Sequence, residues 1–285
     1  QMAYLTGVSS LDLLDPTQPE LVTRLKTPGL ACTFVSRDGL GYLADYYSGF
    51  SIIDLSEEPY MEVISSLDTP GAAVHLALEG DTVYLADMDA GLRVIDVSDP
   101  EVPYEQVSID DRGYGQALAL QGPHAYVANG LSGLRVVDVS DPAKPTPVAR
   151  LDSPVTGVWA LDVEGTRAYL AQGEHGMAIA DISVPEAPSE LASLPLLGDV
   201  RDVQVVGSKA YLAAGSEGGL RVVDVALSDA PYEREGLVDI GDARALHVLN
   251  GYAYVACGEE GLRIIDLGGA EGPELLGSLA TEGAI

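Results

Sequence analysis

Paired carboxylates are the first feature of the sequence that could do chemistry. Asp96 is followed by Asp99-Pro100, and the same spacing returns at Asp138 and Asp141-Pro142. A pair that is copied along the chain cannot be one active site. An aspartate at the first position of a turn accepts hydrogen bonds from backbone N–H groups, and the proline after it presets φ. The repeated carboxylates therefore predict structural turns.

Residues that differ between the copies are better candidates for binding a ligand. Counting ten residues back from a recurring tyrosine gives Cys32, Val74, Gln116, Trp159, Arg201 and Arg244. Tyrosine, tryptophan and arginine dominate binding hot spots, and this chain has a single tryptophan. With nearby loop residues, they predict an aromatic and cationic ligand-binding patch made of Trp159, Arg201, Arg244, Gln116, His75, Tyr46, Tyr47 and Tyr114. The alternative is that Trp159 fills core space and that the arginines pair with loop carboxylates.

One loop could bind a metal ion. The stretch Asp87-Met-Asp-Ala-Gly91 places the carboxylates of Asp87 and Asp89 close together, and hard cations prefer clustered carboxylate oxygens. The downstream acid of a complete calcium loop is missing, because residue 98 is serine. The loop is a candidate calcium site, although the missing acid favours a polar turn, and no other cofactor is expected.

Catalytic patterns are sparse in this sequence. The four histidines form no His-x-x-x-His motif, and no Gly-x-Ser-x-Gly, phosphate-binding or dinucleotide-binding motif is present. We therefore expect no catalytic residue. Cys32 and Cys257 are expected to be two buried small side chains, since their spacing fits no metal motif.

A regular repeat must position these residues. The aspartate that closes each apolar run recurs at intervals of 42 or 43 residues, at Asp12, Asp54, Asp96, Asp138, Asp181, Asp224 and Asp266. Within one copy, four short runs rich in aliphatic and β-branched residues are bounded by Gly, Asp or Pro, as is typical of strands. We name these strands A to D, and in one copy they are Val74–Leu78, Val83–Ala86, Leu92–Val97 and Tyr104–Ser108. No segment has helical periodicity over ten residues.

Four strands in about 42 residues are typical of a propeller blade. Seven copies predict an all-β, seven-bladed β-propeller, in which the B–C and D–A loops share one face around a central channel. The chain starts at a strand B around Tyr4, and its tail Leu279–Ile285 resembles Leu67–Ala73, which precedes a strand A. The two termini are therefore predicted to meet in blade 1 and close the ring. Residues 1–285 are expected to form a single domain, either alone or as one domain of a longer chain.

The charge balance limits the possible partners. The chain has 15 Lys and Arg against 44 Asp and Glu, a net charge of −29. Nucleic acids and anionic membranes need clustered positive charge, so neither is an expected partner. No apolar run is long enough to insert into a membrane. Cations, basic partners or a salt-rich habitat fit better, although a high net charge also keeps a protein soluble.

The repeated motif carries a resemblance to a known family. Gly133-Leu-Arg-Val-Val-Asp-Val-Ser-Asp-Pro142, preceded by Ala-Tyr-Val-Ala at 125–128, resembles the LVIVD repeat. The resemblance implies a β-propeller of bacterial or archaeal cell-surface or secreted proteins, and no catalytic residue set. The copies at Ser9–Pro16 and Gly176–Asp181 depart from the pattern.

These observations favour a non-catalytic module that binds or assembles with a protein or glycan partner through the variable loops. The expected location is extracellular or in the cell envelope. Two alternatives stay open at this point. One is an enzyme with a site at the mouth of the channel, built from Arg201, Arg244, Trp159, His75 and nearby carboxylates. The other is one propeller subunit of a larger surface assembly.

Overall fold

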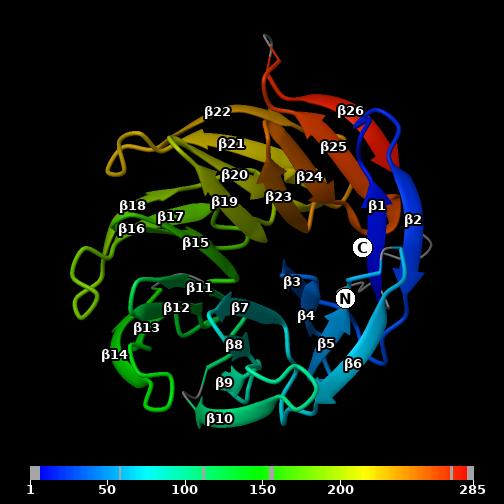
Figure 1. The fold of residues 1–285 in the computed structure, drawn as a ribbon. Coiled ribbons are helices and arrows are strands. Elements are labelled where there is room, and N and C mark those ends of the chain that lie inside the picture. Colours follow the sequence, from blue (N-terminus) through cyan, green and yellow to red (C-terminus); the bar gives the residue numbers. More distant parts are fainter. Residues whose placement is uncertain (1–6, 58, 111–112, 154–156, 270–271, 281–285) are drawn as a thin grey trace. The chain divides into compact units, whose positions relative to one another are not determined.

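The computed structural model describes residues 7–57, 59–110, 113–153, 157–269 and 272–280. Its strands form six four-stranded sheets and one two-stranded sheet (Figure 1). The chain divides into two compact units, which are described separately. The N-terminal unit contains the described residues of Tyr4–Asp12 and Leu21–Val148, and the C-terminal unit contains those of Leu13–Glu20 and Ala149–Ile285.

Three of the four-stranded sheets lie in the N-terminal unit, apart from the end of β14. The first consists of β3 (Thr33–Arg37), β4 (Leu40–Ala44), β5 (Phe50–Asp54) and β6 (Glu62–Leu67). The second consists of β7 (His75–Glu79), β8 (Thr82–Ala86), β9 (Leu92–Asp96) and β10 (Tyr104–Ile109). The third consists of β11 (Ala117–Gln121), β12 (His124–Ala128), β13 (Leu134–Asp138) and β14 (Thr146–Leu151). The two-stranded sheet pairs β1 (Val8–Asp12) with β2 (Glu20–Leu25).

The C-terminal unit holds the other three sheets. The first consists of β15 (Ala160–Glu164), β16 (Arg167–Ala171), β17 (Met177–Asp181) and β18 (Ser189–Leu194). The second consists of β19 (Asp202–Val206), β20 (Lys209–Ala213), β21 (Leu220–Asp224) and β22 (Tyr232–Leu237). The third consists of β23 (Ala245–Leu249), β24 (Tyr252–Ala256), β25 (Leu262–Asp266) and β26 (Glu274–Leu279). Two B–C loops contain short helices, α1 (Gly215–Gly218) and η1 (Gly258–Glu260). Helices this short cannot show a helical period, so sequence periodicity does not predict them.

The four strands predicted for each copy are confirmed in six copies, and the prediction of seven four-stranded blades is wrong. The first copy contributes only β1 and β2 among the described residues. This copy is also shortened between strands B and C, because Tyr4 stands only eight residues before Asp12, against twelve residues in the regular copies. Its predicted strand B around Tyr4 lies outside the described residues, as does the tail at 281–285. Closure of one ring by the two termini therefore stays a prediction.

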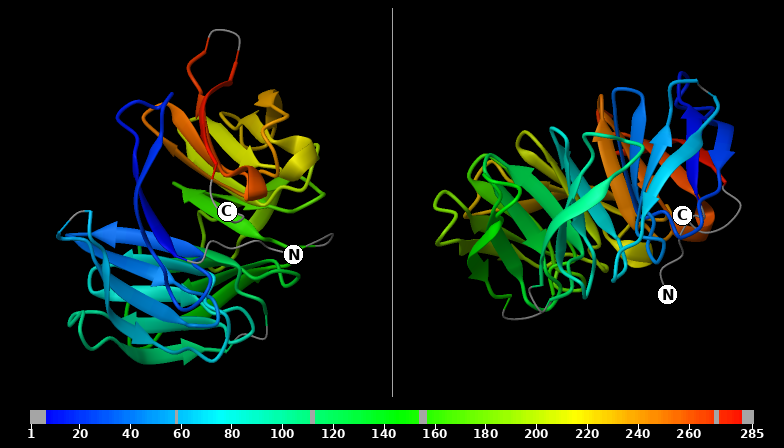
Figure 2. Two further views of the ribbon diagram at one scale, coloured as in Figure 1. Left: turned by 90° about the vertical axis from the view of Figure 1, so that its right-hand side faces the viewer. Right: turned by 60° about the horizontal axis from the view of Figure 1, so that its bottom comes forward.

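The core lies in the middle strands of each sheet. Five of the recurring tyrosines of strand B are buried, with Tyr42, Tyr84 and Tyr126 at most 2 % exposed, whereas Tyr254 is half-buried. Four consecutive residues of β8, Val83–Ala86, are buried, so both faces of the strand are covered. This explains why the strands are continuously apolar and do not alternate with polar residues. Successive sheets within a unit contact one another through their first strands, β3 with β7 and β7 with β11, and likewise β15 with β19 and β19 with β23 (Figures 1 and 2).

The first strand of each sheet is an edge strand, so half of its backbone groups need partners from outside the sheet. A polar side chain on the first strand of the preceding sheet supplies several of them. In the C-terminal unit, Asp162 accepts the N–H of Val205 at 2.7 Å, and Asp202 accepts the N–H of Leu246 at 2.8 Å. The Oε1 of Gln204 accepts the N–H of Val248 at 2.7 Å.

The same arrangement occurs in the N-terminal unit. Thr33 Oγ1 donates to the carbonyl of Val74 at 3.0 Å, and His75 Nδ1 accepts the N–H of Leu118 at 3.4 Å. These hydrogen bonds join neighbouring sheets along their edges. They are the polar counterpart of the apolar packing between the sheets.

The repeated aspartates at the end of strand C build turns, as the sequence predicted. In all six complete sheets the carboxylate accepts the backbone N–H two residues later, in Asp54, Asp96, Asp138, Asp181, Asp224 and Asp266. The hydrogen bond from the Ser140 N–H lowers the pKa of the Asp138 carboxyl. Asp99 and Asp141, which precede prolines, each accept a further N–H in the same turns.

The edge hydrogen bonds make stability depend on Gln204. The substitution Gln204→Leu has similar volume but leaves the buried N–H of Val248 without its acceptor, which costs about 1–3 kcal/mol. We expect chemical denaturation to show that loss in the free energy of unfolding. The matched control is Gln106→Leu, where the exposed amide donates only to an exposed carboxylate. A surface change of that kind stays within about 0.5 kcal/mol. Equal losses in the two variants would contradict the edge role.

Asp202 gives the stability a specific pH dependence. Burial raises the pKa of its carboxyl from the usual value of 3.8 to about 7, even though backbone N–H groups oppose the shift. The folded protein therefore binds this proton more tightly than the unfolded chain. Its contribution is fully present below about pH 4 and is lost as the pH rises to about 7.

We therefore expect Asp202→Asn to gain stability relative to the wild type as the pH rises from about 4 to 7, on the order of a few kcal/mol at the upper end. Urea denaturation at a series of pH values measures this difference. Asp38→Asn, in an exposed turn, is the control and should follow the wild type at every pH. A constant difference between Asp202→Asn and the wild type would refute the assignment.

Candidate functional site

The six residues that the sequence aligned occupy equivalent places in their sheets. The backbone N–H of each residue donates to the carbonyl of the alanine that ends strand B, at 2.8–3.0 Å. The pairs are Cys32 with Ala44, Val74 with Ala86, Gln116 with Ala128, Trp159 with Ala171, Arg201 with Ala213 and Arg244 with Ala256. The alignment is confirmed, and it places these residues immediately before the first strands.

The B–C and D–A loops lie at the same end of the sheets within each unit. The second residue of every B–C loop has a left-handed φ between +39° and +65°, at Tyr46, Met88, Gly130, Gly173, Gly215 and Gly258. Four of these residues form a bridge to the segment before the next first strand, pairing Tyr46 with Ala73, Met88 with Gly115, Gly173 with Val200 and Gly215 with Ala243. A side chain at such a φ costs about 1–2 kcal/mol, so Tyr46 and Met88 occupy strained positions.

In the C-terminal unit, this loop end carries a cleft of about 460 Å³. It lies between the loop after β16, the segment from β18 to β19 and the loop that contains α1. Its lining combines apolar and charged side chains, namely Glu174, Leu196, Leu197, Gly198, Asp199, Arg201, Ser216 and Glu217. The volume is within the range of about 300–1,000 Å³ that is common for ligand sites. Of the sequence-predicted residues, Arg201 lines it.

A row of alternating charges borders the cleft. Arg201 donates from Nε to Asp199 at 2.9 Å and from Nη1 to Asp242 at 2.7 Å, and Arg244 Nε donates to the other oxygen of Asp242 at 2.8 Å. Burial raises the pKa of the Asp242 carboxyl, but the hydrogen bond from Arg244 and the charges of both arginines lower it by more. We call Asp199, Arg201, Asp242 and Arg244 the charge ladder. It matches the alternative considered from the sequence, in which the arginines pair with loop carboxylates.

Trp159 lies beside this ladder. It is 41 % exposed, so it does not fill the core. A Cβ added to Gly173 would lie 3.1 Å from the indole Nε1 of Trp159 and 3.2 Å from Oδ1 of Asp199. The indole and the carboxylate therefore both lie close to the Cβ position of Gly173. The structure thus brings Trp159 and Arg201 together through Asp199.

The other predicted residues belong to the N-terminal unit. Tyr46 and Tyr47 form an edge-to-face pair with ring centroids 4.3 Å apart, and Tyr47 is 74 % exposed. Tyr114 is also exposed, and Gln116 is half-buried. His75 is part of the edge hydrogen bonding, and burial lowers its pKa to about 4, so it is neutral near pH 7. The eight predicted residues thus divide between the two units.

Asp87 has a structural role in this conformation. It is fully buried, Oδ1 accepts the hydroxyl of Thr69 at 2.8 Å and Oδ2 accepts the N–H of Gly71 at 3.1 Å. Arg93 Nε lies 3.3 Å from the same Oδ2. Burial raises the pKa of the carboxyl despite these partners. Asp89 is exposed. Within the described residues, no group of three or more His, Cys, Asp or Glu is arranged to hold a metal ion.

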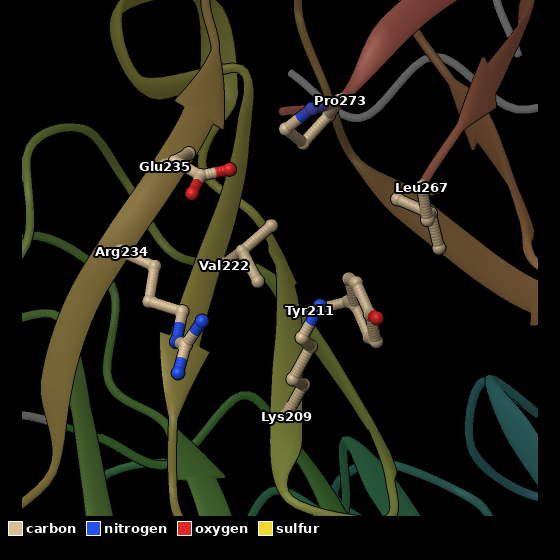
Figure 3. Close-up of a pocket in the computed structure, with 7 residues that line it drawn as sticks. All are labelled: Lys209, Tyr211, Val222, Arg234, Glu235, Leu267 and Pro273. Atoms are coloured by element: carbon tan, nitrogen blue, oxygen red, sulfur yellow. The ribbon is translucent and has the colours of Figure 1, made fainter. Parts of the chain in front are cut away.

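A second, much smaller cavity lies at the opposite end of the C-terminal unit, between its second and third sheets (Figure 3). Its lining includes Lys209, Tyr211 and Arg234, with Leu267 and Pro273 across from them. Its volume of about 30 Å³ has room for little more than a water molecule. It therefore offers no ligand site.

Both cysteines are free thiols, and burial raises the pKa of Cys32 and of Cys257 to about 12.

Most of the cleft lining was not predicted from the sequence. The predicted residues are mainly aromatic or cationic, whereas Glu174, Glu217 and two leucines line the cleft. One signal was present, because the spacing Asp-x-Arg occurs at both Asp199–Arg201 and Asp242–Arg244. In each case the acid stands two residues before the arginine, just ahead of a first strand. When adjacent copies share this spacing, the arginine of one copy can pair with the acid of the next copy and so join two sheets.

The fold and its loop end define a class of protein, a repeat-built β-propeller with six complete four-stranded blades. Solved structures with this fold include a Bacteroides fragilis protein described as a candidate 6-phosphogluconolactonase, with TM-score 0.80 and 11 % identity over 94 % of this chain and 88 % of that one. A Lactobacillus plantarum protein has TM-score 0.77 and 14 % identity over 95 % and 90 %. A Desulfotomaculum acetoxidans protein has TM-score 0.74 and 12 % identity over 91 % and 93 %. At these identities the likeness shows the fold alone.

The family is shown by the repeat itself. The LVIVD repeat matches residues 70–111, 112–153, 157–194, 197–231 and 240–281, which is well over half of the chain. The chain belongs to the LVIVD repeat family. No curated protein matches its sequence.

The charge ladder makes a measurable contribution through Asp242. Asp242→Asn removes the carboxylate that joins the two arginines, and we expect it to lower the free energy of unfolding by about 1 kcal/mol at pH 7, because the group is partly exposed. The pKa of Asp242 is lowered in the folded protein, so its contribution is present above the unfolded pKa and lost at lower pH.

The deficit of Asp242→Asn should therefore shrink as the pH falls below about 4, as measured by urea denaturation. Asp229→Asn, on an exposed turn of the same unit, is the control. A deficit that stays constant down to pH 2–3, on the order of the value at pH 7, would contradict the ion-pair role.

Proposed function

We propose that the protein is a non-catalytic binding module that docks a protein partner in the cleft of the C-terminal unit. The observation that carries the proposal is the cleft of about 460 Å³ at the variable-loop end, with an exposed apolar side chain on its wall. Its loops are the ones that differ from copy to copy, whereas the repeated residues build turns and strands.

Leu197 provides the apolar part of this surface. It is 57 % exposed, while its neighbour Leu196 is 8 % exposed and anchors the segment below it. Covering an exposed leucine in a concave site contributes about 1.5–3 kcal/mol to binding. The charged residues around it supply orientation and selectivity, as polar rims do in protein interfaces.

The charge ladder disfavours the enzyme alternative at this cleft. Arg201 and Arg244 are each held by carboxylates, so their charges are already balanced within the protein. Asp242 stays ionised between them and is unsuited to donate a proton near neutral pH. The same groups suit a rigid recognition surface, because the ion pairs fix their orientation before a partner arrives.

We place this module outside the cell or in the cell envelope, where the acidic surface would meet partner proteins. A net charge of −29 repels nucleic acids and anionic membranes, which supports a protein partner. No helix within the described ranges is both long and apolar enough to cross a membrane. A glycan is the second candidate ligand for the same surface.

An array of random-sequence peptides tests the proposal. The labelled full chain should bind a reproducible subset of peptides, and Leu197→Asp should weaken their binding at least about tenfold, since roughly 1.4 kcal/mol corresponds to that factor. The control is Leu227→Asp, which changes another exposed leucine of the same unit, 67 % exposed in the turn after β21. If Leu197→Asp binds the same peptides as strongly as the control does, the cleft is not the binding site.

A further inference from the structure

We infer that the cleft selects a basic side chain of its partner, a cation carried on an aliphatic stem as in lysine or arginine. This rests on the proposed function and specifies what that site recognises. The inference comes from the balance of charges in the lining, from the apolar wall and from the position of Trp159.

The lining carries more negative than positive charge. It contains the carboxylates of Glu174, Asp199 and Glu217 and one cation, Arg201. Arg201 is also bound to Asp242, which is not part of the lining, so its charge is shared with a carboxylate outside the cleft. Neither Glu174 nor Glu217 has an ion pair with any residue that the structure describes. A cation in the cleft would therefore meet two carboxylates that form no ion pair with any described residue.

The wall of the cleft suits the stem of a long basic side chain. Leu196 and Leu197 form an apolar surface on the segment that leads into β19. Lysine and arginine place their methylene groups against apolar surface while the charged head reaches polar groups. Small inorganic cations have no such stem, so the apolar wall would contribute no binding energy to them.

Trp159 lies beside the cleft, outside its lining, and offers a further contact to a cation held near Asp199. Its indole and the Asp199 carboxylate both approach the Cβ position of Gly173, and the indole is partly exposed. An ammonium or guanidinium group near the face of an indole gains about 0.5–2 kcal/mol from the ring. Glycine is favoured at position 173, because φ is +62° and because a Cβ there would lie only 3.1–3.2 Å from the indole and the carboxylate.

The single tryptophan makes the inference directly testable, because Trp159 is the only indole in the chain. Its fluorescence emission can be followed while the full chain is titrated with the peptide acetyl-Gly-Gly-Lys-Gly-Gly-amide. We expect a saturable change in emission at millimolar peptide. Binding should weaken when salt is raised from about 0.1 to 1 M, since the screening length falls from about 10 Å to 3 Å. Peptides with Gln or Glu in place of Lys should produce no saturable change.

A pair of matched double variants locates the effect. Glu174→Gln with Glu217→Gln removes two charges from the cleft and should weaken binding of the lysine peptide about three- to thirtyfold. Glu186→Gln with Glu190→Gln removes the same charge from exposed positions on the outer part of the preceding blade and should leave the affinity unchanged. Thermal unfolding of both variants confirms that they are folded.

The outcomes separate this inference from the proposed function. A Gln peptide that binds as well as the Lys peptide would overturn the selectivity for a cation and leave the binding module in place. If both double variants weaken binding of the lysine peptide equally, the net charge of the protein attracts the peptide and the cleft does not. That result would also overturn the inference. The absence of any saturable change up to millimolar peptide would overturn it as well. The proposed function itself fails only if Leu197→Asp leaves the bound peptides of the array unchanged.

Discussion

The unpaired edge of the first strand in each sheet is the constraint on which the structure depends. Backbone groups on that edge need partners, and a strand that lacks them is costly to bury and prone to wrong pairing. In both units the preceding sheet supplies side chains such as Asp162, Gln204 and Thr33 for this purpose. Within each unit, successive sheets are thereby tied together by polar contacts as well as by their apolar faces. Loop residues can vary because these contacts hold the strands in place.

Hydrogen-bond partners distinguish the carboxylates that stabilise the fold from those that could bind a partner. The aspartates that recur after strand C accept N–H groups of their own turns, and Asp87 accepts Thr69 and Gly71. Their charges serve the fold. Among the described residues, no hydrogen-bond donor or cation is paired with the carboxylates of Glu174 and Glu217, which lie in loops that line a cleft. In a chain of net charge −29, the carboxylates that already accept a hydrogen bond from the protein are less available to bind a ligand, so this property separates the two groups.

The strands, their number per copy and their turns were predictable because each is determined locally. Short apolar runs bounded by Gly, Asp and Pro define a strand without reference to the rest of the chain, and the 42-residue period aligned Trp159, Arg201 and Arg244 correctly. The count of complete blades was not predictable in this way. Whether the first copy forms four strands depends on pairing partners distant in sequence, and only β1 and β2 are described there.

By itself, the sequence determined the all-β repeat, the family and the set of positions that vary between copies. The tertiary structure decided what those positions do. It paired Arg201 with both Asp199 and Asp242, and it placed Trp159 and Asp199 close to the Cβ position of Gly173. It also opened a cleft between three loops, whose acidic lining no single copy reveals. The physical reason is that ion pairs and cavities form between sheets, where residues about 42 positions apart meet, whereas strands and turns form within a few residues.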